Sequence, residues 1–301
     1  MRHYSKRNWP RYNENLVVRG EILLQFEVLR DWQQEAVRMN EGKRGRPFRY
    51  PKTLILFFGL IRAAFHLPYR QLEGLARSLN QLTHVPAPDY TTFSLRLAHL
   101  WLNPEPELDP TQPILLVVDS SGIKRTHRGE WRKGDQRQWV KIHVAVDART
   151  KQVLSLSMTD RYTHDSNEFM GLVKEARNYA TIDRVLADAA YDDKGNYHFL
   201  KWLGIKPGIN PKSNSGFFWR KRPPNTARAD VIREWQKDPQ KWKERVGYKK
   251  RQAVESFFSS FKRQFGESAQ SRTWMKIYQE MMLKVWLYNL WVCPESVPTR
   301  V

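Results

Sequence analysis

The chain has 301 residues, which suggests about two domains with cores large enough to be stable without disulfides. It carries 51 Lys and Arg against 31 Asp and Glu, a formal net charge of +20, and its one cysteine, Cys293, excludes an intrachain disulfide or a cysteine-based metal cluster. The longest apolar run, 54–65, is too short to cross a bilayer, and the N-terminus lacks an apolar signal core. We therefore expect a soluble, cytoplasmic protein with a polyanionic partner. Nucleic acid is the first candidate, and an anionic membrane surface is the second.

The first hundred residues predict a helical region. One helix is expected over 16–37, and a basic turn follows at 42–47. Three further helices are expected over 50–102, separated by the breaks at 66–68 and 86–88 that contain prolines. Three short helices with tight turns are typical of a helix-turn-helix unit, although a plain helical bundle explains the pattern equally well.

The third of these helices carries the candidate DNA contacts of this region. Asp89 is a good N-cap for it. In the helix-turn-helix interpretation, Thr91, Thr92 and Arg96 near the start of the helix face DNA. Four prolines in the next segment, 103–113, mark the best domain boundary. We place a helical DNA-binding region at 1–104 and a second domain at 105–301.

The second domain predicts an α/β layout with a mixed sheet. Three apolar or alternating segments come first, then a helix that starts near Asp165, and then strand, helix and strand. The expected strands are 114–118, 139–146, 153–158, 185–187 and 205–209, and the second helix is 194–203. Asp119 and Asp188 follow the first and fourth strands directly, and a final apolar helix is expected over 278–291.

The stretch 211–247 has little apolar periodicity and predicts an irregular basic insertion. Residues 212–263 contain 15 Lys and Arg against 5 Asp and Glu, so much of the positive charge lies here. The insertion also contains Trp219, Trp235 and Trp242. A tryptophan can stack on a displaced base, but packing in a core is its commoner role.

A helix over 248–262 presents two different faces. Its apolar residues recur at helical spacing and predict one buried stripe, formed by Val254, Phe257, Phe258, Phe261 and Phe265. Arg251, Glu255, Ser259 and Lys262 share another face, which puts a single acid among cations. Taken alone, this row more often means a solvated helix with an ion pair four residues apart.

Asp119, Asp188 and Glu255 together suggest a metal site. Carboxylates at strand ends project from the edge of a sheet where α/β sites assemble. Three converging acids repel one another, and a divalent cation removes that cost. Two such ions bracket a scissile phosphate in two-metal nucleases.

Here the sequence resembles a known family, the DDE transposases of the insertion sequence 5 group, whose catalytic domain has the ribonuclease H-like fold. Asp119, Asp188 and Glu255 resemble the acidic triad of that family. Its signature of Tyr, Arg, Glu and Lys at fixed gaps is matched by Tyr248, Arg251, Glu255 and Lys262. The segments 12–20 and 45–50 also resemble the amino-terminal part of this family, so the resemblance covers nearly the whole chain. The segment between Asp188 and Glu255 is short for the large β-strand insertion of some relatives.

The resemblance implies specific roles. The three acids hold Mg²⁺, two ions in all, with Asp119 as the bridging ligand and Mn²⁺ as a possible substitute. Tyr248, Arg251 and Lys262 contact phosphates of the transposon end, and Lys249 and Lys250 beside them are further candidates for DNA contacts. The protein then binds terminal inverted repeats and target DNA as a homodimer or higher oligomer, and associates with the nucleoid when bound.

Several neighbouring residues have simpler interpretations. Asp165 is expected to cap a helix, Asp147 to lie in a turn, and Asp192 and Asp193 to have surface or capping roles. A lone histidine is more often structural than catalytic, and this is the expectation for His127, His143 and His164.

The expected function is metal-dependent phosphodiester hydrolysis followed by strand transfer, in cut-and-paste transposition. One alternative is a structure-specific nuclease of the same fold, which cuts without joining. Another is a DNA-binding protein whose chemistry has been lost. A membrane-surface protein is the weakest alternative, because the basic residues do not lie opposite a membrane-inserting apolar face.

Overall fold

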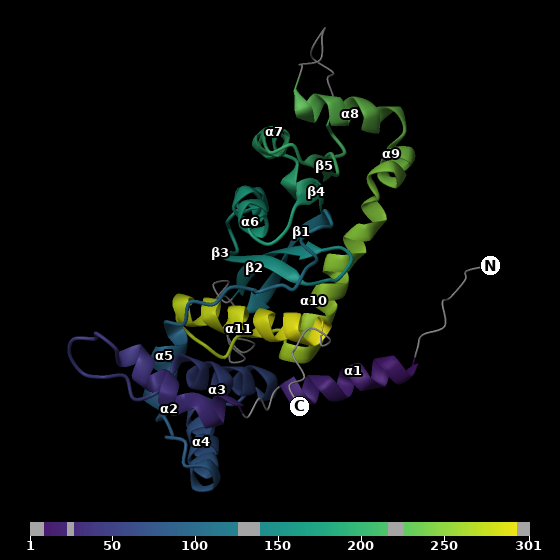
Figure 1. Ribbon diagram of the computed structural model, residues 1–301. Helices are drawn as coiled ribbons and strands as arrows, with labels where there is room; N and C mark the ends of the chain where they lie inside the picture. The colour runs from purple at the N-terminus through teal and green to yellow at the C-terminus, as the bar shows by residue number, and fades with distance from the viewer. Residues whose placement is uncertain (1–8, 23–26, 126–138, 216–225, 294–301) are drawn as a thin grey trace, which may run out of the picture. The chain divides into compact units, whose positions relative to one another are not determined.

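The computed structural model of the protein describes residues 9–22, 27–125, 139–215 and 226–293. Its contacts divide the chain into two compact units (Figure 1). Met1–Asn103 and Gln270–Val301 form the first unit, and Pro104–Ala269 forms the second. The sequence analysis assigned 105–301 to one domain, whereas the contacts group the segment after Ala269 with the N-terminal helices. The reason is the packing of the last helix on α3 and α5, two helices of the first unit.

The described part of the first unit is helical. Its elements are α1 (Trp9–Ile22), α2 (Glu27–Asn40), α3 (Lys52–Phe65), α4 (Tyr69–Thr83), α5 (Tyr90–Ala98) and α11 (Trp274–Val292). The three helices predicted over 50–102 are therefore confirmed as α3, α4 and α5. The helix predicted over 16–37 falls on two described helices, α1 and α2, and its Leu23, Leu24 and Phe26 lie outside the described residues. None of the described helices has the length and apolar character needed to cross a bilayer.

The breaks between these helices follow the sequence. His66 and His84 end α3 and α4 in the left-handed conformation, with φ of 55° and 57°. Asp89 caps α5 as predicted, because its carboxylate accepts the backbone N–H of Thr92 at 2.7 Å. Gly59 allows α3 and α5 to approach closely, since a Cβ there would lie 2.7 Å from the side chain of Leu97.

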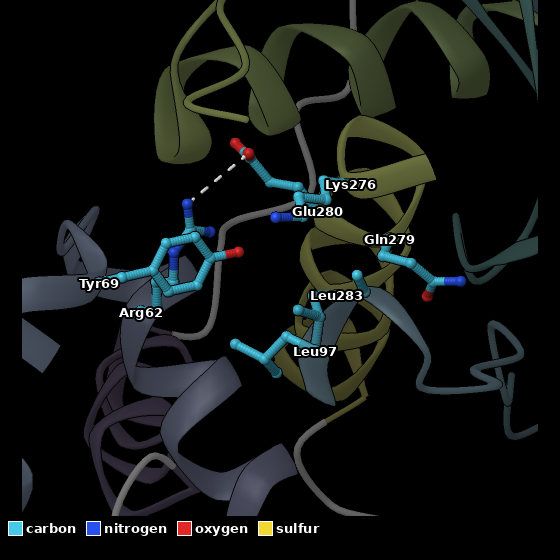
Figure 2. A pocket seen from close by; sticks show the side chains of 8 residues that line it. Arg62, Tyr69, Leu97, Lys276, Gln279, Glu280 and Leu283 are labelled. Atoms are coloured by element: carbon cyan, nitrogen blue, oxygen red, sulfur yellow. Dashed lines mark ion pairs between the residues drawn. The ribbon is translucent and has the colours of Figure 1, made fainter. Parts of the chain in front are cut away.

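A buried ionic network lies in the first unit (Figure 2). Glu280 is 3% exposed and accepts the ammonium group of Lys284 at 2.9 Å, while the guanidinium of Arg62 lies 3.8 Å away. Its carboxylate also accepts the backbone N–H groups of Gln270 (3.0 Å) and Ser271 (2.9 Å). This acid therefore fastens the residues that lead into α11, and α11 itself, to α3.

The second unit is built on a five-stranded mixed sheet with the order β3-β2-β1-β4-β5. Its strands are β1 (Ile114–Lys124), β2 (Trp139–Asp147), β3 (Val153–Asp160), β4 (Ile182–Ala187) and β5 (Lys206–Ile209). β1, β2 and β3 pair antiparallel, whereas β4 pairs parallel with β1 and β5 parallel with β4. The expected mixed α/β fold is confirmed, and three antiparallel strands extended by two parallel ones form the expected ribonuclease H-like sheet.

Helices cover this sheet on both faces (Figure 1). α6 (Phe169–Ala176) packs on β2 and β3, α7 (Lys194–Trp202) packs on β5 and α6, and α10 (Gln252–Phe265) packs on β1 and β2. Successive side chains of a strand alternate between the two faces. Leu116 and Val118 belong to the core cluster on the α6 side, so Val117 and Asp119 project toward the α10 side.

The prediction of irregular structure over 211–247 is wrong for the second half of that stretch. Two helices, α8 (Ala227–Lys237) and α9 (Pro239–Val246), occupy it, each begun by a side-chain cap from Thr226 or Asp238. Both helices are rich in charged residues. Their few buried positions, which pack them on the unit, were therefore not recognised in the sequence as an apolar helical pattern. Trp242 is one of these, and its 3% exposure confirms packing rather than availability for a base. Trp219 lies outside the described residues.

The Glu280 network gives an expectation for stability against pH. Burial opposes the charge of Glu280, but Lys284 and Arg62 outweigh burial and lower its pKa to about 2 from an ordinary 4.5. Because the pKa is lower in the folded protein, the stabilisation is complete above about pH 4.5 and is lost as the pH falls toward 2. Glu280→Gln should lose this dependence and destabilise the first unit by roughly 3 kcal/mol, since it leaves buried cations uncompensated.

The measurement is hydrogen exchange of the amides in α3 and α11 across this pH range. Glu41→Gln is the control, because Glu41 is an exposed acid in the same unit. Equal pH dependence in Glu280→Gln and in the unmodified protein would contradict the assigned network.

Candidate active site

The helix α10 is anchored by the apolar stripe that its sequence predicts. Val254, Phe257 and Phe261 are fully buried, and Phe258 and Phe265 are 8% and 1% exposed. This stripe faces the unit's interior, and Glu255 and Lys262 lie on a different face of the helix, in line with Arg251 of the preceding turn. Glu255 is exposed and Lys262 half-buried. The stripe thus holds the mixed-charge row in a fixed position beside the sheet.

Asp119 lies inside β1 rather than after its end. The sequence placed it just past a strand of 114–118, but pairing with β2 continues through Asp119↔Val144 as far as Lys124↔Trp139. The residues after Asp119 are less apolar, so periodicity alone did not extend the strand. Strand alternation directs the Asp119 carboxylate toward α10, and it also accepts the backbone N–H of Ser120 at 2.9 Å.

Arg251 joins two of the predicted acids. Its Nη2 lies 3.2 Å from Oδ2 of Asp119, and its Nη1 lies 2.9 Å from Oε1 of Glu255. The second contact is the ion pair four residues apart that a solvated helix would also form. The first contact crosses 132 residues of sequence, so the helix alone cannot explain it. The Arg251 side chain is only 18% exposed, which places the guanidinium between the sheet and the helix.

Asp188 lies close to the same point. It follows β4 directly and begins the short helix η4 (Ala189–Tyr191), where its side chain accepts the backbone N–H of Ala190 at 2.9 Å. Burial raises the pKa of Asp119 to about 6, Arg251 opposes this rise, and the charges of Asp188 and Glu255 add to it. The three acids are therefore near enough to repel one another.

These carboxylates suit a hard divalent cation, which prefers oxygen ligands. Within the described ranges no group of three or more His, Cys, Asp and Glu residues is arranged to hold a metal as it stands. Arg251 provides the positive charge between Asp119 and Glu255. The carboxylate oxygens of these acids are the donor type that a hard divalent ion takes.

The turn before α10 adds further cations. Lys249 and Lys250 are exposed in the short helix η5 (Tyr248–Arg251), which follows Gly247 at a φ of 70°. The Tyr248 hydroxyl donates to the carbonyl of Ala187 at 3.4 Å, which connects η5 to the end of β4. Burial raises the pKa of Tyr248 to about 12.

Asp165 is not the helix cap that the sequence suggested. Its carboxylate accepts the Ser120 hydroxyl and the Lys141 ammonium group, both at 2.8 Å. Burial acts to raise its pKa, but these two hydrogen bonds hold the pKa of Asp165 below its ordinary value. The reason is strand alternation, since Ser120 and Lys141 point to the face opposite Asp119. The sequence analysis gave no role to Lys141, which lies inside the predicted strand 139–146, or to Tyr191, which follows Asp188 by three residues.

Tyr191 is fully buried three residues after Asp188, and its ring packs 5.7 Å from that of Phe169. Its hydroxyl lies near Ser120 but finds no hydrogen-bond partner of normal geometry. Burial raises its pKa far above the ordinary value, and the carboxylates of Asp119 and Asp165 raise it further. The hydroxyl of Tyr191 therefore stays protonated and lies close to the acidic cluster.

Asp192 differs from its predicted surface or capping role, whereas Asp193 caps α7 as expected through the N–H of Gly195 at 2.7 Å. The Asp192 side chain is fully buried and accepts Nε and Nη2 of Arg228 at 2.6 and 2.8 Å. It also accepts the hydroxyl of Ser215 at 2.9 Å. Asp192 was not recognisable as buried because its partner lies 36 residues away, in the basic insertion.

Of the three histidines considered, His143 has the structural role expected of it. His143 is fully buried in β2, and its Nε2 lies 2.7 Å from the hydroxyl of Thr159. Burial lowers the pKa of His143, which favours the neutral ring. His164 is exposed, and His127 lies outside the described residues.

The first-unit candidates lie on α5, with Thr91 and Thr92 in its first turn and Arg96 in its last turn. The Thr91 hydroxyl is hydrogen-bonded to Asp89, and the Thr92 backbone N–H is used by the same cap. The Arg96 guanidinium lies 5.1 Å from the centre of the Phe48 ring, and burial lowers its pKa. Arg96 therefore does not lie near the start of the helix as expected, because α5 is only 9 residues long, and its side chain is already partly covered.

Comparison with known families gives two matches. A sequence profile described as "Transposase DDE domain" matches residues 110–290, and a second profile with the same description matches residues 17–128. The first match covers more than half of the chain and includes every candidate acid.

Solved structures give distant similarities. A piggyBac transposase synaptic complex with hairpin DNA is 11% identical with a TM-score of 0.41, over 94% of this chain and 75% of that one. The catalytic core domain of BIV integrase is 11% identical with a TM-score of 0.27, over 60% of this chain and 84% of that one. The Mos1 strand transfer complex is 11% identical with a TM-score of 0.24, over 82% and 80%. TM-scores this low carry no argument about the chain.

The unpaired hydroxyl of Tyr191 leads to a stability expectation. Tyr191→Phe should leave the free energy of unfolding unchanged or raise it by up to about 1 kcal/mol, because it removes a buried group that lacks a partner. Tyr197→Phe is the matched control, since Tyr197 is equally buried but its hydroxyl donates to the carbonyl of Ile209 at 3.2 Å. That variant should lose about 1–3 kcal/mol. Urea unfolding checks both, and equal losses would mean that the Tyr191 hydroxyl has a partner in solution.

Proposed function

This chain belongs to the family of transposases with a DDE domain, and from that premise we propose that it is an insertion sequence 5 enzyme that cuts and rejoins transposon ends. As a transposase it is an enzyme whose substrate is DNA. The proposed reaction has two steps. Water hydrolyses a phosphodiester at the transposon end and frees a 3′-hydroxyl. That hydroxyl then attacks a phosphodiester of target DNA, so that the transposon 3′ end is joined to the target 5′-phosphate and a target 3′-hydroxyl is released.

The observation that carries this proposal is the meeting of Asp119, Arg251 and Glu255. One guanidinium lies within 3.2 Å of both acids, although Asp119 is far away in sequence. Asp188 is near enough to raise the pKa of Asp119. An acidic cluster beside cations is what phosphodiester chemistry needs, because carboxylates bind metal while cations bind phosphate.

We assign Asp119, Asp188 and Glu255 as the catalytic residues that would hold the metal. They would hold two Mg²⁺ ions, or Mn²⁺ in their place, and the chemistry that these ions supply when bound is activation of water and neutralisation of phosphate charge. The side chains themselves fix where the scissile phosphate lies. The apolar stripe keeps Glu255 in position, and the Ser120 N–H and the β2 pairing keep Asp119 in position.

The cations beside the acids would orient the DNA end. Lys249 and Lys250 are exposed and suit phosphate contacts without rearrangement. Lys262 lies on α10, on the same face of the helix as Glu255. Tyr248 would have to exchange its long bond to the Ala187 carbonyl for a phosphate. Arg251 would have to leave its two acids.

The first unit would supply recognition of the terminal inverted repeats. Its α3, α4 and α5 suit a helix-turn-helix arrangement, with Thr91, Thr92 and Arg96 toward DNA. Since cut-and-paste transposition pairs two ends, we propose a homodimer or larger homo-oligomer on DNA.

Replacing Asp119 by Asn tests the assignment. The change keeps the shape but removes the negative charge, so cleavage of labelled repeat DNA in Mg²⁺ should fall by more than about a hundredfold. Binding of the same DNA should stay within about threefold, because phosphate contacts dominate affinity. Gel analysis of cut products and fluorescence anisotropy of binding give the two values.

Asp193→Asn is the control, because Asp193 caps α7 and should be dispensable for cleavage. A fully active Asp119→Asn protein would contradict the site. With unmodified protein, repeat DNA and target plasmid, joined product supports a transposase that is still active. Cutting without joining favours a structure-specific nuclease. Binding without cutting in either Mg²⁺ or Mn²⁺ favours a DNA-binding protein that has lost its chemistry.

A further inference from the structure

Arg251 forms an internal salt bridge at the position where the proposed function needs a metal. Both of its terminal nitrogens are engaged, Nη2 with Asp119 and Nη1 with Glu255. The other oxygen of Asp119 accepts the backbone N–H of Ser120. Both oxygens of the Asp119 carboxylate are therefore used by groups of the protein itself.

This contact differs from an ordinary surface ion pair. The side chains of Arg251 and Asp119 are only 18% and 16% exposed, so water screens their attraction weakly. Without the guanidinium, Asp119 would be a half-buried charge facing two other acids. The guanidinium thus acts as the counter-ion of the acidic cluster.

A guanidinium and a divalent cation compete for these oxygens. Two cations at contact distance repel in a partly buried site, and the carboxylate oxygens that point at Arg251 are of the donor type that a divalent ion takes. Binding of metal by Asp119 and Glu255 is therefore opposed by Arg251 and favoured when Arg251 turns away. Once released, this cation is adjacent to Lys250 on η5, where phosphates of DNA would be its next partners.

We propose that Arg251 is an exchangeable counter-ion that holds the acids until metal displaces it, and that its release to a DNA phosphate couples metal binding to end binding. This inference rests on the proposed function, because it uses the same acids and the same DNA. Arg251 is here a positioning residue. Since coupling between two sites is reciprocal, metal must tighten DNA binding by the same factor by which DNA tightens metal binding.

The first test measures metal binding without DNA. Mn²⁺ is titrated into the full chain at about pH 8, well above the pKa of about 6 of Asp119, and free Mn²⁺ is followed by electron paramagnetic resonance. Arg251→Ala removes the competing cation, so its Mn²⁺ dissociation constant should fall by about tenfold, which is a typical size for such coupling. Arg251→Gln, which keeps hydrogen-bonding groups without the charge, serves as a second variant if the alanine variant folds poorly.

Lys250→Ala is the matched control. It removes one positive charge from the same turn, but Lys250 is exposed and makes no bond to the acids. A general electrostatic effect would tighten Mn²⁺ binding in Lys250→Ala as much as in Arg251→Ala. A specific exchange should tighten it in the Arg251 variants and change it less than about twofold in Lys250→Ala.

The second test measures the coupling. The DNA is a repeat end that has already been cut at its boundary, so the protein cannot cleave it during the measurement. Its affinity for the protein is measured with and without Mn²⁺ at constant ionic strength. The unmodified protein and Lys250→Ala should bind DNA at least about fivefold more tightly with Mn²⁺. Arg251→Ala should bind this DNA more weakly and gain nothing from Mn²⁺.

The outcomes separate the two proposals. If Asp119→Asn binds Mn²⁺ as well as the unmodified protein does, the acidic site itself is misassigned and the proposed function fails. If Asp119→Asn loses Mn²⁺ but Arg251→Ala and Arg251→Gln do not gain affinity, the site stands and the counter-ion role is wrong. An equal Mn²⁺ effect on DNA affinity in all variants would likewise overturn the coupling.

Discussion

The second unit depends on one electrostatic constraint, which is that three carboxylates must be brought together in a partly buried place without losing the fold. Repulsion and desolvation both act against this arrangement, and the pKa of Asp119, raised to about 6, records that cost. The fold offsets the cost with Arg251, which binds two of the acids at once. A cation at this point is therefore part of the structure as well as of the proposed chemistry.

Strand alternation separates that acidic cluster from a second polar network. Along β1, Asp119 points toward α10, while its neighbour Ser120 points toward α6 and hydrogen-bonds to Asp165. Lys141 completes the second network from β2. Because neighbouring strand residues point to opposite faces, Asp119 lies in the proposed site, whereas Ser120 binds Asp165 on the other face of the sheet. The buried, neutral Tyr191 lies close to acids of both networks.

Arginine or lysine paired with a buried acid recurs elsewhere in the chain. Asp192 and Arg228 fasten α8 to the end of the sheet, and Glu280 with Arg62 fastens α11 to α3. Removing one partner of a buried pair costs more than the pair itself contributes, because the other charge stays uncompensated. In this chain with a net charge of +20, several of the acids are thus used as buried partners of basic side chains.

Most of the local structure was determined by the sequence itself. The prolines, the Asp89 cap, the strand runs and the phenylalanine stripe of α10 all act over a few residues, so their spacing is sufficient to predict the elements and the candidate acids. What only the tertiary structure decided depends on partners distant in the chain. Pairing with β2 placed Asp119 inside its strand, Arg228 made Asp192 a buried residue, and packing grouped α11 with the N-terminal helices. The bridge from Arg251 to Asp119 is of the same kind, since no local pattern reveals which of several cations will meet a given acid across 132 residues.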